Sequence, residues 1–163
     1  MAERPSFRSG IGYDSHRFTP GGPLVLGGVE IPADVHLHGH SDGDAVAHAV
    51  TDAVLGAAGL GDIGSMFPDT DPANAGRDSI EMLILAAGHV EAAGWRVGQV
   101  DVVVITETPR IAPYRAAMRQ RIAGALRCTP EDVSLKGKTN EGMGFVGRGE
   151  GLACLATATL YRA

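Results

Sequence analysis

The sequence has few aromatic residues and no excess of positive charge, and the lack of positive charge narrows its possible binding partners. Aromatic side chains make up 5% of the 163 residues, and the formal net charge at pH 7 is -5. A nucleic-acid surface needs clustered Lys and Arg in a basic domain, so a nucleic-acid partner is not expected. An anionic ligand would instead need a few local donors.

Cysteine is also scarce, and long apolar runs are missing. Cys128 and Cys154 lack the spacing of a C-x-x-C motif, so reduced thiols in a cytoplasmic protein are expected rather than a disulfide. No uncharged apolar run approaches ~20 residues, so no membrane span and no membrane partner is expected. The first residues do not resemble a targeting segment, and a flexible tail is expected at residues 1–6.

Glycine, by contrast, is abundant. The chain has 23 glycines in 163 residues, which is about 14% against a usual ~7%. They lie in short clusters without a repeat, which indicates tight turns and close backbone contacts. At this length a single domain over residues 1–163 is expected, large enough to bury a core.

Strand and helix patterns alternate along the chain. Strands are expected over residues 7–18, 24–32 with a break at Gly27 and Gly28, 97–105, 133–138 and 152–161, the last of which also fits a helix. Helices are expected between Ser41 and Gly59, over 78–93 and over about 113–127. This order predicts an α/β or α+β fold, with about four long strands covered on one face by helices. The other face of the sheet would then be buried by assembly of the chain into an oligomer.

Residues 39–71 concentrate polar side chains that ordinary packing does not require. Ser41 with Asp44 fits a capping box at a helix start, and the apolar positions that follow repeat with helical spacing. Asp44, His48 and Asp52 are four residues apart, so they share another face of that helix. The pattern indicates a scaffold that presents His48 to a metal and a phosphate-rich ligand.

Three histidines precede this helix at alternate positions. His36 and His38 lie in a stretch without a pattern and are expected in an exposed loop. His40 adjoins the helix start, where free amides and the helix dipole favour anions. His40 is therefore the candidate phosphate contact among the three.

A second pair of candidate ligands lies on the first strand. Asp14 and His16 project from the same face because side chains alternate along a strand. Alone, this pair would be better explained by a solvated strand edge. With His48 it forms a two-nitrogen, one-oxygen set typical of tetrahedral zinc with one open position, although other first-row metals also accept these ligands. Asp44 is a competing carboxylate, ranked lower because capping already accounts for it.

Two further segments carry candidate binding groups. Residues 60–72 place Ile63 and Phe67 among acids and turn formers, which favours a partly ordered pocket wall over a solvated acidic loop. Residues 139–151 combine polar side chains with five glycines. Arg148 could hold phosphate there, and Glu141 could hold a magnesium ion that keeps several waters. A glycine-rich hairpin turn is the alternative explanation.

Together these segments resemble the 2-C-methyl-D-erythritol 2,4-cyclodiphosphate synthases of the non-mevalonate isoprenoid pathway. The resemblance covers essentially the whole chain. It rests on GIGYDSHRF (10–18), LGGVEIP (26–32), GHSDGD with His48 (39–48), LGDIGSMFPDTDP (60–72), VDVVVITETPRI (100–111) and TNEGMGFVGRGEG (139–151).

The resemblance implies a homotrimer with active sites between subunits. It implies Zn2+ held by Asp14, His16 and His48, and Mg2+ or Mn2+ held with the substrate diphosphate by Glu141. The implied enzyme is a phosphorus–oxygen lyase acting on 4-diphosphocytidyl-2-C-methyl-D-erythritol 2-phosphate. The 2-phosphate would attack the β-phosphorus, close a cyclic diphosphate and release CMP. Such a displacement needs alignment and charge neutralisation rather than a side-chain nucleophile.

The resemblance also assigns roles to individual residues. His40 and Thr139 would stabilise the transition state. The phosphate and metal side of the substrate would meet Asp14, Ser15, His16, His40, Ser41, Lys138, Thr139, Asn140, Glu141, Phe145 and Arg148. The methylerythritol pocket would be formed by Asp62, Ile63, Gly64, Phe67, Pro68, Asp69, Thr70 and Asp71. The cytidine would be held by Thr106, Glu107, Thr108, Pro109, Arg110, Ile111 and Ala112, mainly through backbone groups.

The sequence departs from the family pattern at a few positions. Arg110 stands where many members have lysine, and Lys138 and Asn140 flank Thr139 where many have further threonines. Arg110 keeps the positive charge with a different shape, and Lys138 and Asn140 alter the expected phosphate contacts. Two other functions fit parts of the pattern: a zinc-dependent phosphohydrolase, and a non-catalytic oligomer that binds nucleotide or metal.

Overall fold

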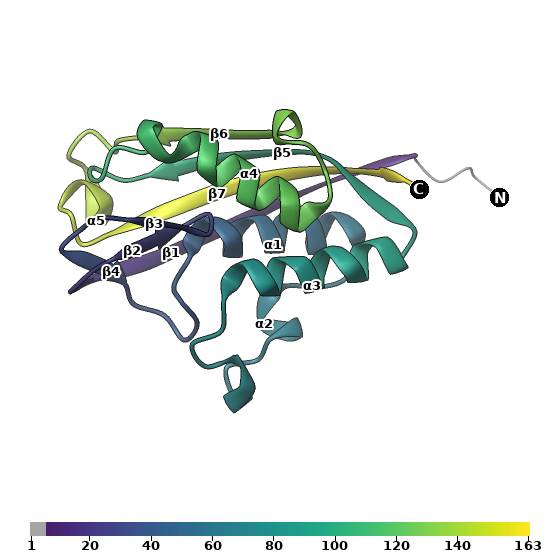
Figure 1. Ribbon diagram of the computed structural model, residues 1–163, viewed down its shortest axis with the longest axis horizontal. Helices are drawn as coiled ribbons and strands as arrows, with labels where there is room; N and C mark the ends of the chain where they lie inside the picture. Colours follow the sequence, from purple (N-terminus) through teal and green to yellow (C-terminus); the bar gives the residue numbers. More distant parts are fainter. Residues whose placement is uncertain (1–5) are drawn as a thin grey trace.

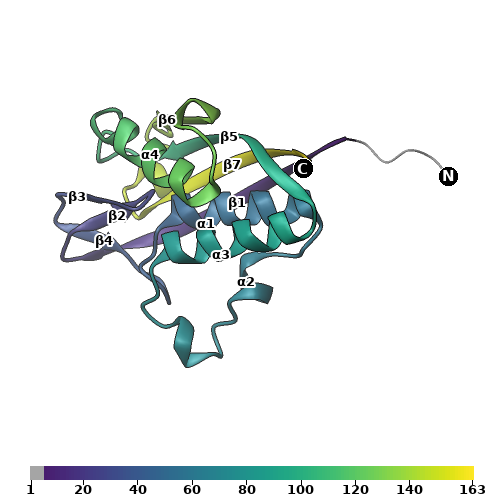
Figure 2. The same ribbon diagram turned by 45° about the vertical axis from the view of Figure 1, so that its right-hand side comes forward.

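A five-stranded mixed sheet forms one layer of the protein, and helices cover one of its faces (Figures 1 and 2). The computed structural model describes residues 6–163. The strand order is β4-β1-β7-β5-β6. Of the tail expected at residues 1–6, residues 1–5 lie outside the described residues.

The two longest strands lie side by side in this sheet. β1 (Phe7–Pro20) and β7 (Gly151–Arg162) pair antiparallel over eleven registered positions, from Phe7 opposite Tyr161 to Arg17 opposite Gly151. β5 (Trp95–Ile105) pairs antiparallel with β7, and β6 (Val133–Lys138) pairs parallel with β5. The predicted strands are confirmed, and the helical alternative for residues 152–161 is wrong.

The prediction of about four strands missed one short edge strand. β4 (Val35–Leu37) pairs with the end of β1, and three residues are too few to show an alternating pattern. It carries His36, which is half-buried with Nδ1 2.6 Å from the carbonyl oxygen of Gly21, so the exposed-loop prediction for His36 is wrong. His38 is exposed as expected. β2 (Leu24–Leu26) and β3 (Val29–Ile31) form a separate hairpin, with the predicted break at Gly27 and Gly28.

Three long helices form the second layer. They are α1 (Ala45–Ala58), α3 (Ser79–Ala92) and α4 (Arg115–Leu126). The short helices are α2 (Ile63–Met66), η1 (Pro72–Asn74), η2 (Ala112–Tyr114), η3 (Pro130–Asp132) and α5 (Gly144–Gly147). The helix predictions are confirmed to within about three residues. None of the helices in residues 6–163 is long and apolar enough to cross a membrane.

The capping box predicted for α1 is wrong in its partners. Asp44, not Ser41, caps α1 by accepting from the amide of Ala47, and its carboxylate also accepts from the amides of Gly27 and Gly28. Asp78 caps α3 by accepting from the amide of Ile80. A local pattern could not reveal that Asp44 also binds a turn far away in the sequence. A capping box is present at Thr129 and Asp132, at the start of η3.

Helix α1 packs closely against β1 because two glycines of the strand face it. A Cβ added to Gly12 would lie 1.9 Å from the carbonyl oxygen of Ala49, and one added to Gly10 would lie 2.2 Å from that of Ala53. Side chains at these positions would therefore push the helix away from the strand. The small residues on both surfaces set the distance between the two elements that carry the candidate metal ligands.

We predict that Gly12→Ala lowers the free energy of unfolding by about 1–3 kcal/mol, because the new methyl group collides with helix backbone. Urea denaturation at one fixed protein concentration measures the change. Gly56→Ala is the matched control, because Gly56 lies on the exposed side of α1 with open space around it. The control should raise stability by about 0.5–1 kcal/mol. Wild-type stability in Gly12→Ala would contradict the packing argument.

Candidate metal centre and active site

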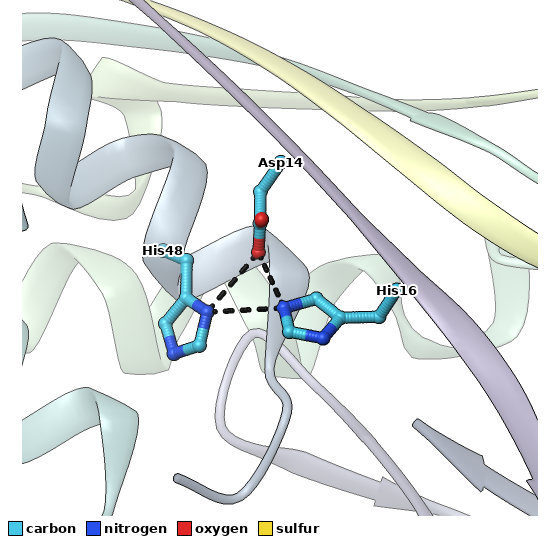
Figure 3. Close-up of side chains that lie close together, drawn as sticks. All are labelled: Asp14, His16 and His48. Atoms are coloured by element: carbon cyan, nitrogen blue, oxygen red, sulfur yellow. Dashed lines mark hydrogen bonds and ion pairs between the residues drawn. The ribbon is translucent and has the colours of Figure 1, made fainter. Parts of the chain in front are cut away.

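Asp14, His16 and His48 converge in one cluster, as the sequence predicted (Figure 3). The Oδ2 atom of Asp14 lies 2.7 Å from His16 Nε2 and 3.1 Å from His48 Nδ1, and those two nitrogens are 3.3 Å apart. β1 supplies the first two residues from one face, and α1 supplies the third. The side chains of the cluster are 12–25% exposed, so a small ion could reach them.

The outer nitrogens of both imidazoles have hydrogen-bond partners that orient the rings. His16 Nδ1 lies 2.6 Å from the carbonyl oxygen of His38, which can only accept, so this nitrogen carries the proton. His48 Nε2 lies 2.8 Å from Ser79 Oγ and 3.0 Å from Ser41 Oγ. When His16 is neutral, as metal binding requires, the lone pair of its Nε2 is therefore directed at the centre of the cluster, which His48 Nδ1 also faces. Two imidazoles and a carboxylate with such supports fit a divalent metal.

The electrostatics of the cluster also fit a cation. Burial raises the pKa of Asp14, but hydrogen bonds from His16 and His48 outweigh it and hold the pKa below its usual value. Burial lowers the pKa of His16, but the hydrogen bond and charge of Asp14 outweigh it and raise the pKa above 6.5. The carboxylate is therefore ionised at neutral pH and available as a ligand.

Asp44, the competing candidate, lies outside this cluster. Its fully buried carboxylate faces the amides of Gly27, Gly28 and Ala47. Burial raises the pKa of Asp44 to about 6, against the effect of these amide donors. Asp44 thus fixes the start of α1 and leaves the ligand position to Asp14.

A cavity of about 210 Å³ adjoins the cluster. Its lining brings together candidates from three segments: Asp14, His16, His40, Ser41, His48, Ile63, Gly64, Phe67 and Asp69, with Asn74 and Met82 in addition. Asn74 and Met82 were not selected from the sequence, because they follow the expected wall and share no motif with it. Asp62, Pro68, Thr70 and Asp71 are exposed and do not line this cavity.

Hydrogen bonds order the wall of this cavity, so the solvated-loop alternative is wrong. Asp52 accepts from the amide of Ile63 at 2.7 Å, and Asp62 caps α2 through the amide of Ser65. Farther along, the side chain of buried Asn74 donates to the carbonyl oxygen of Pro68 at 3.0 Å. Asp71 caps η1 through the amide of Ala73. The wall is therefore held to α1 by Asp52, and hydrogen bonds between its own residues fix its shape.

A second cavity, of about 290 Å³, lies beyond the ends of β5 and β6. Its lining contains most of the segment expected to hold cytidine: Thr106, Glu107, Pro109, Arg110, Ile111 and Ala112, with Arg115, Gly137, Lys138 and Thr139. Thr108 contributes a carbonyl that accepts from the hydroxyl of Thr106 at 2.5 Å. The two cavities share no lining residue, so the candidate substrate-binding residues lie in separate cavities of this chain.

The glycine-rich segment lies next to the second cavity. Glu107 accepts from the amides of Asn140 and Gly142, which fixes the turn that presents Glu141. Glu141 has a left-handed backbone with φ of 53° and an exposed carboxylate 3.1 Å from Thr139 Oγ1. The segment continues into α5, so the simple hairpin-turn alternative is wrong.

The remaining candidates occupy a third hollow, of about 230 Å³. Ser15, His16, Arg17, Phe145 and Glu150 line it, so His16 borders both this hollow and the cavity of the metal cluster. Arg148 lies nearby in sequence and donates through Nε to Glu150 at 2.9 Å. Binding of a phosphate by Arg148 would therefore compete with that ion pair.

The YgbB family profile matches residues 7–161. The chain belongs to the YgbB family. A 2-C-methyl-D-erythritol 2,4-cyclodiphosphate synthase of Gemmatimonas aurantiaca is 64% identical over 153 residues, covering 94% of this chain and 92% of the relative. The synthase of that name from Escherichia coli is 52% identical over 156 residues, covering 96% and 98%.

Solved structures of this family have the same fold. IspF of Plasmodium falciparum in complex with CDP is 32% identical, with a TM-score of 0.85 over 98% of this chain and 99% of that one. A 2C-methyl-D-erythritol-2,4-cyclodiphosphate synthase with bound CDP is 40% identical, with a TM-score of 0.86 over 94% and 99%. The α+β fold class expected from the sequence is thereby confirmed.

We predict that acid weakens metal binding at the cluster, because a proton on His16 Nε2 occupies the ligand position. From about pH 7.5 to about pH 5.5 the Zn2+ dissociation constant should rise at least about tenfold, since the pKa of His16 lies above its usual value. A competition titration with a chromophoric chelator measures it. His89→Gln, an exposed site on α3, should keep the wild-type pH dependence. A flat profile would contradict the prediction.

Proposed function

We propose that this protein converts 4-diphosphocytidyl-2-C-methyl-D-erythritol 2-phosphate to 2-C-methyl-D-erythritol 2,4-cyclodiphosphate and CMP. An oxygen of the 2-phosphate forms a bond to the β-phosphorus. The bond from that phosphorus to the bridging oxygen breaks, and its electron pair leaves with CMP. The enzyme would accordingly be a phosphorus–oxygen lyase. The cluster of Asp14, His16 and His48 beside a walled cavity, in a chain of the YgbB family, carries this proposal.

The cluster would hold Zn2+, which suits two imidazoles and a carboxylate with an open fourth position. Bound there, the ion would supply positive charge to phosphate oxygens. Glu141, exposed on its turn, would hold Mg2+ or Mn2+ together with the substrate diphosphate. His40 and Thr139 would stabilise the charge that develops on the transferred phosphorus.

Positioning of the substrate would account for most of the rate, because the reaction lies within one molecule. The wall from Asp62 to Asp71 would enclose the methylerythritol, and residues 106–112 would hold the cytidine. Neither cysteine suits a nucleophilic role. Burial raises the pKa of Cys128 to about 11, and that of the fully buried Cys154 lies well above its usual value.

A homotrimer would complete the site, and two features support it. The sheet face away from the helices exposes apolar side chains, with Phe7 62%, Ile11 69%, Tyr13 54% and Leu155 38% exposed. Such a face is typical of an interface. The cavity of the metal cluster and the cavity at residues 106–112 are separate within one chain, so halves from neighbouring subunits would form each site.

Phosphorus NMR of the protein with the diphosphocytidyl substrate, Zn2+ and Mg2+ tests the proposed reaction. We expect free CMP together with paired cyclic-diphosphate signals. Release of inorganic phosphate without the cyclic product would show a phosphohydrolase instead. An unchanged spectrum from folded protein with bound zinc would favour a binding module, and either result would overturn the proposal.

We predict that Glu141→Gln raises the Mg2+ concentration needed for half-maximal activity about tenfold or more, because the amide replaces a charged oxygen ligand. Metal analysis of the purified variant should still show wild-type zinc content. Glu131→Gln is the control, because exposed Glu131 precedes β6, at the opposite end of that strand. An unchanged Mg2+ profile in Glu141→Gln would reject its role.

A further inference from the structure

The hydroxyl of Ser79 connects the metal-cluster residue His48 to Asp42. Ser79 is the first residue of α3 and is fully buried. Its Oγ atom lies 2.8 Å from His48 Nε2, and its hydroxyl donates to the carboxylate of Asp42. Neither Ser79 nor Asp42 belongs to the candidate residues selected from the sequence.

The direction of these hydrogen bonds follows from the groups involved. A carboxylate only accepts, so the single hydroxyl hydrogen of Ser79 is used on Asp42. Toward His48, Ser79 Oγ can then only accept, and Nε2 must carry the imidazole proton. The lone pair of His48 is thereby left on Nδ1, the nitrogen that faces Asp14. This chain of carboxylate, hydroxyl and imidazole selects the tautomer that binds a metal.

Backbone amides hold Asp42 in place. Its carboxylate accepts from the amide of Ser79 and from that of Asp44, both at 3.0 Å. Asp42 therefore joins the start of α3 to the start of α1, the helix that carries His48. The carboxylate of Asp42 thus fixes the starts of α1 and α3 relative to each other. Because α3 follows the cavity wall in the chain, the same contact limits movement between His48 and the segment that leads out of the wall.

We propose that Ser79 and Asp42 are positioning residues that hold His48 in the tautomer and orientation needed for metal binding. The inference rests on the proposed function, because it requires that the cluster binds a metal. His16 differs, because its outer nitrogen bonds a backbone carbonyl that no side-chain substitution removes. The hydroxyl of Ser41 also lies 3.0 Å from His48 Nε2. We do not assign Ser41 the positioning role, because it lines the cavity, where a phosphate would engage its hydroxyl.

The test measures Zn2+ affinity by competition with a chromophoric chelator in Ser79→Ala and Asp42→Asn. We expect the dissociation constant to rise about 10–100-fold in each, the range found when outer partners of metal-binding histidines are lost. Thr51→Val is the matched control. Thr51 is also a fully buried hydroxyl, on the same helix as His48, but it donates to the carbonyl oxygen of Ala47. The control should keep wild-type affinity.

Nitrogen-15 NMR of the histidines adds a measurement of the His48 tautomer, which a general loss of packing would not change. In the wild-type zinc protein the His48 Nε2 proton should exchange slowly with water, and its shift should indicate a single tautomer. In Ser79→Ala this proton should exchange rapidly, while thermal unfolding reports that the variant remains folded.

Several outcomes would overturn the inference. Wild-type zinc affinity in both variants would do so, and so would an equal loss in Thr51→Val. His48→Ala separates this inference from the proposed function. If His48→Ala loses zinc while Ser79→Ala keeps it, the positioning role fails and the metal site stands. If the wild-type protein binds no zinc, both fail.

Discussion

The close packing of α1 against β1 is the constraint on which the candidate site depends. Gly10 and Gly12 leave the strand without side chains where the helix backbone lies against it. This contact places His48 within hydrogen-bond distance of Asp14, two residues beyond Gly12. Asp44 secures the same helix from its start, by joining it to the turn between β2 and β3. The metal cluster is therefore a consequence of backbone packing as much as of its own three residues.

Around this rigid cluster the site is built from ordered but more exposed segments. The wall from Asp62 to Asn74 is fixed by side-chain caps and by Asp52 on α1. The turn at residues 139–142 is fixed by Glu107. A reaction within one substrate molecule needs such fixed surfaces more than it needs a reactive side chain. The separation of the two cavities in one chain supports the proposal that a neighbouring subunit completes each site.

Much of the fold could be predicted from the sequence, because its longest elements have clear periodicity. The alternation along β1 already placed Asp14 and His16 on one face, and helical spacing gave α1. β4 was missed because three residues show no period. The capping partners were wrong because Asp44 binds amides of Gly27 and Gly28, contacts that exist only after folding. Ser79 was missed for the same reason, since 31 positions separate it from His48.

The most direct test of the account is anomalous diffraction from crystals of the protein at the zinc absorption edge. We expect one strong peak per chain, about 2.0–2.2 Å from Asp14 Oδ2, His16 Nε2 and His48 Nδ1. The same crystals should show residues 106–112 of a neighbouring subunit facing that peak. A peak at other residues, or none in zinc-saturated crystals, would contradict the central claim that packing of α1 on β1 builds a metal site.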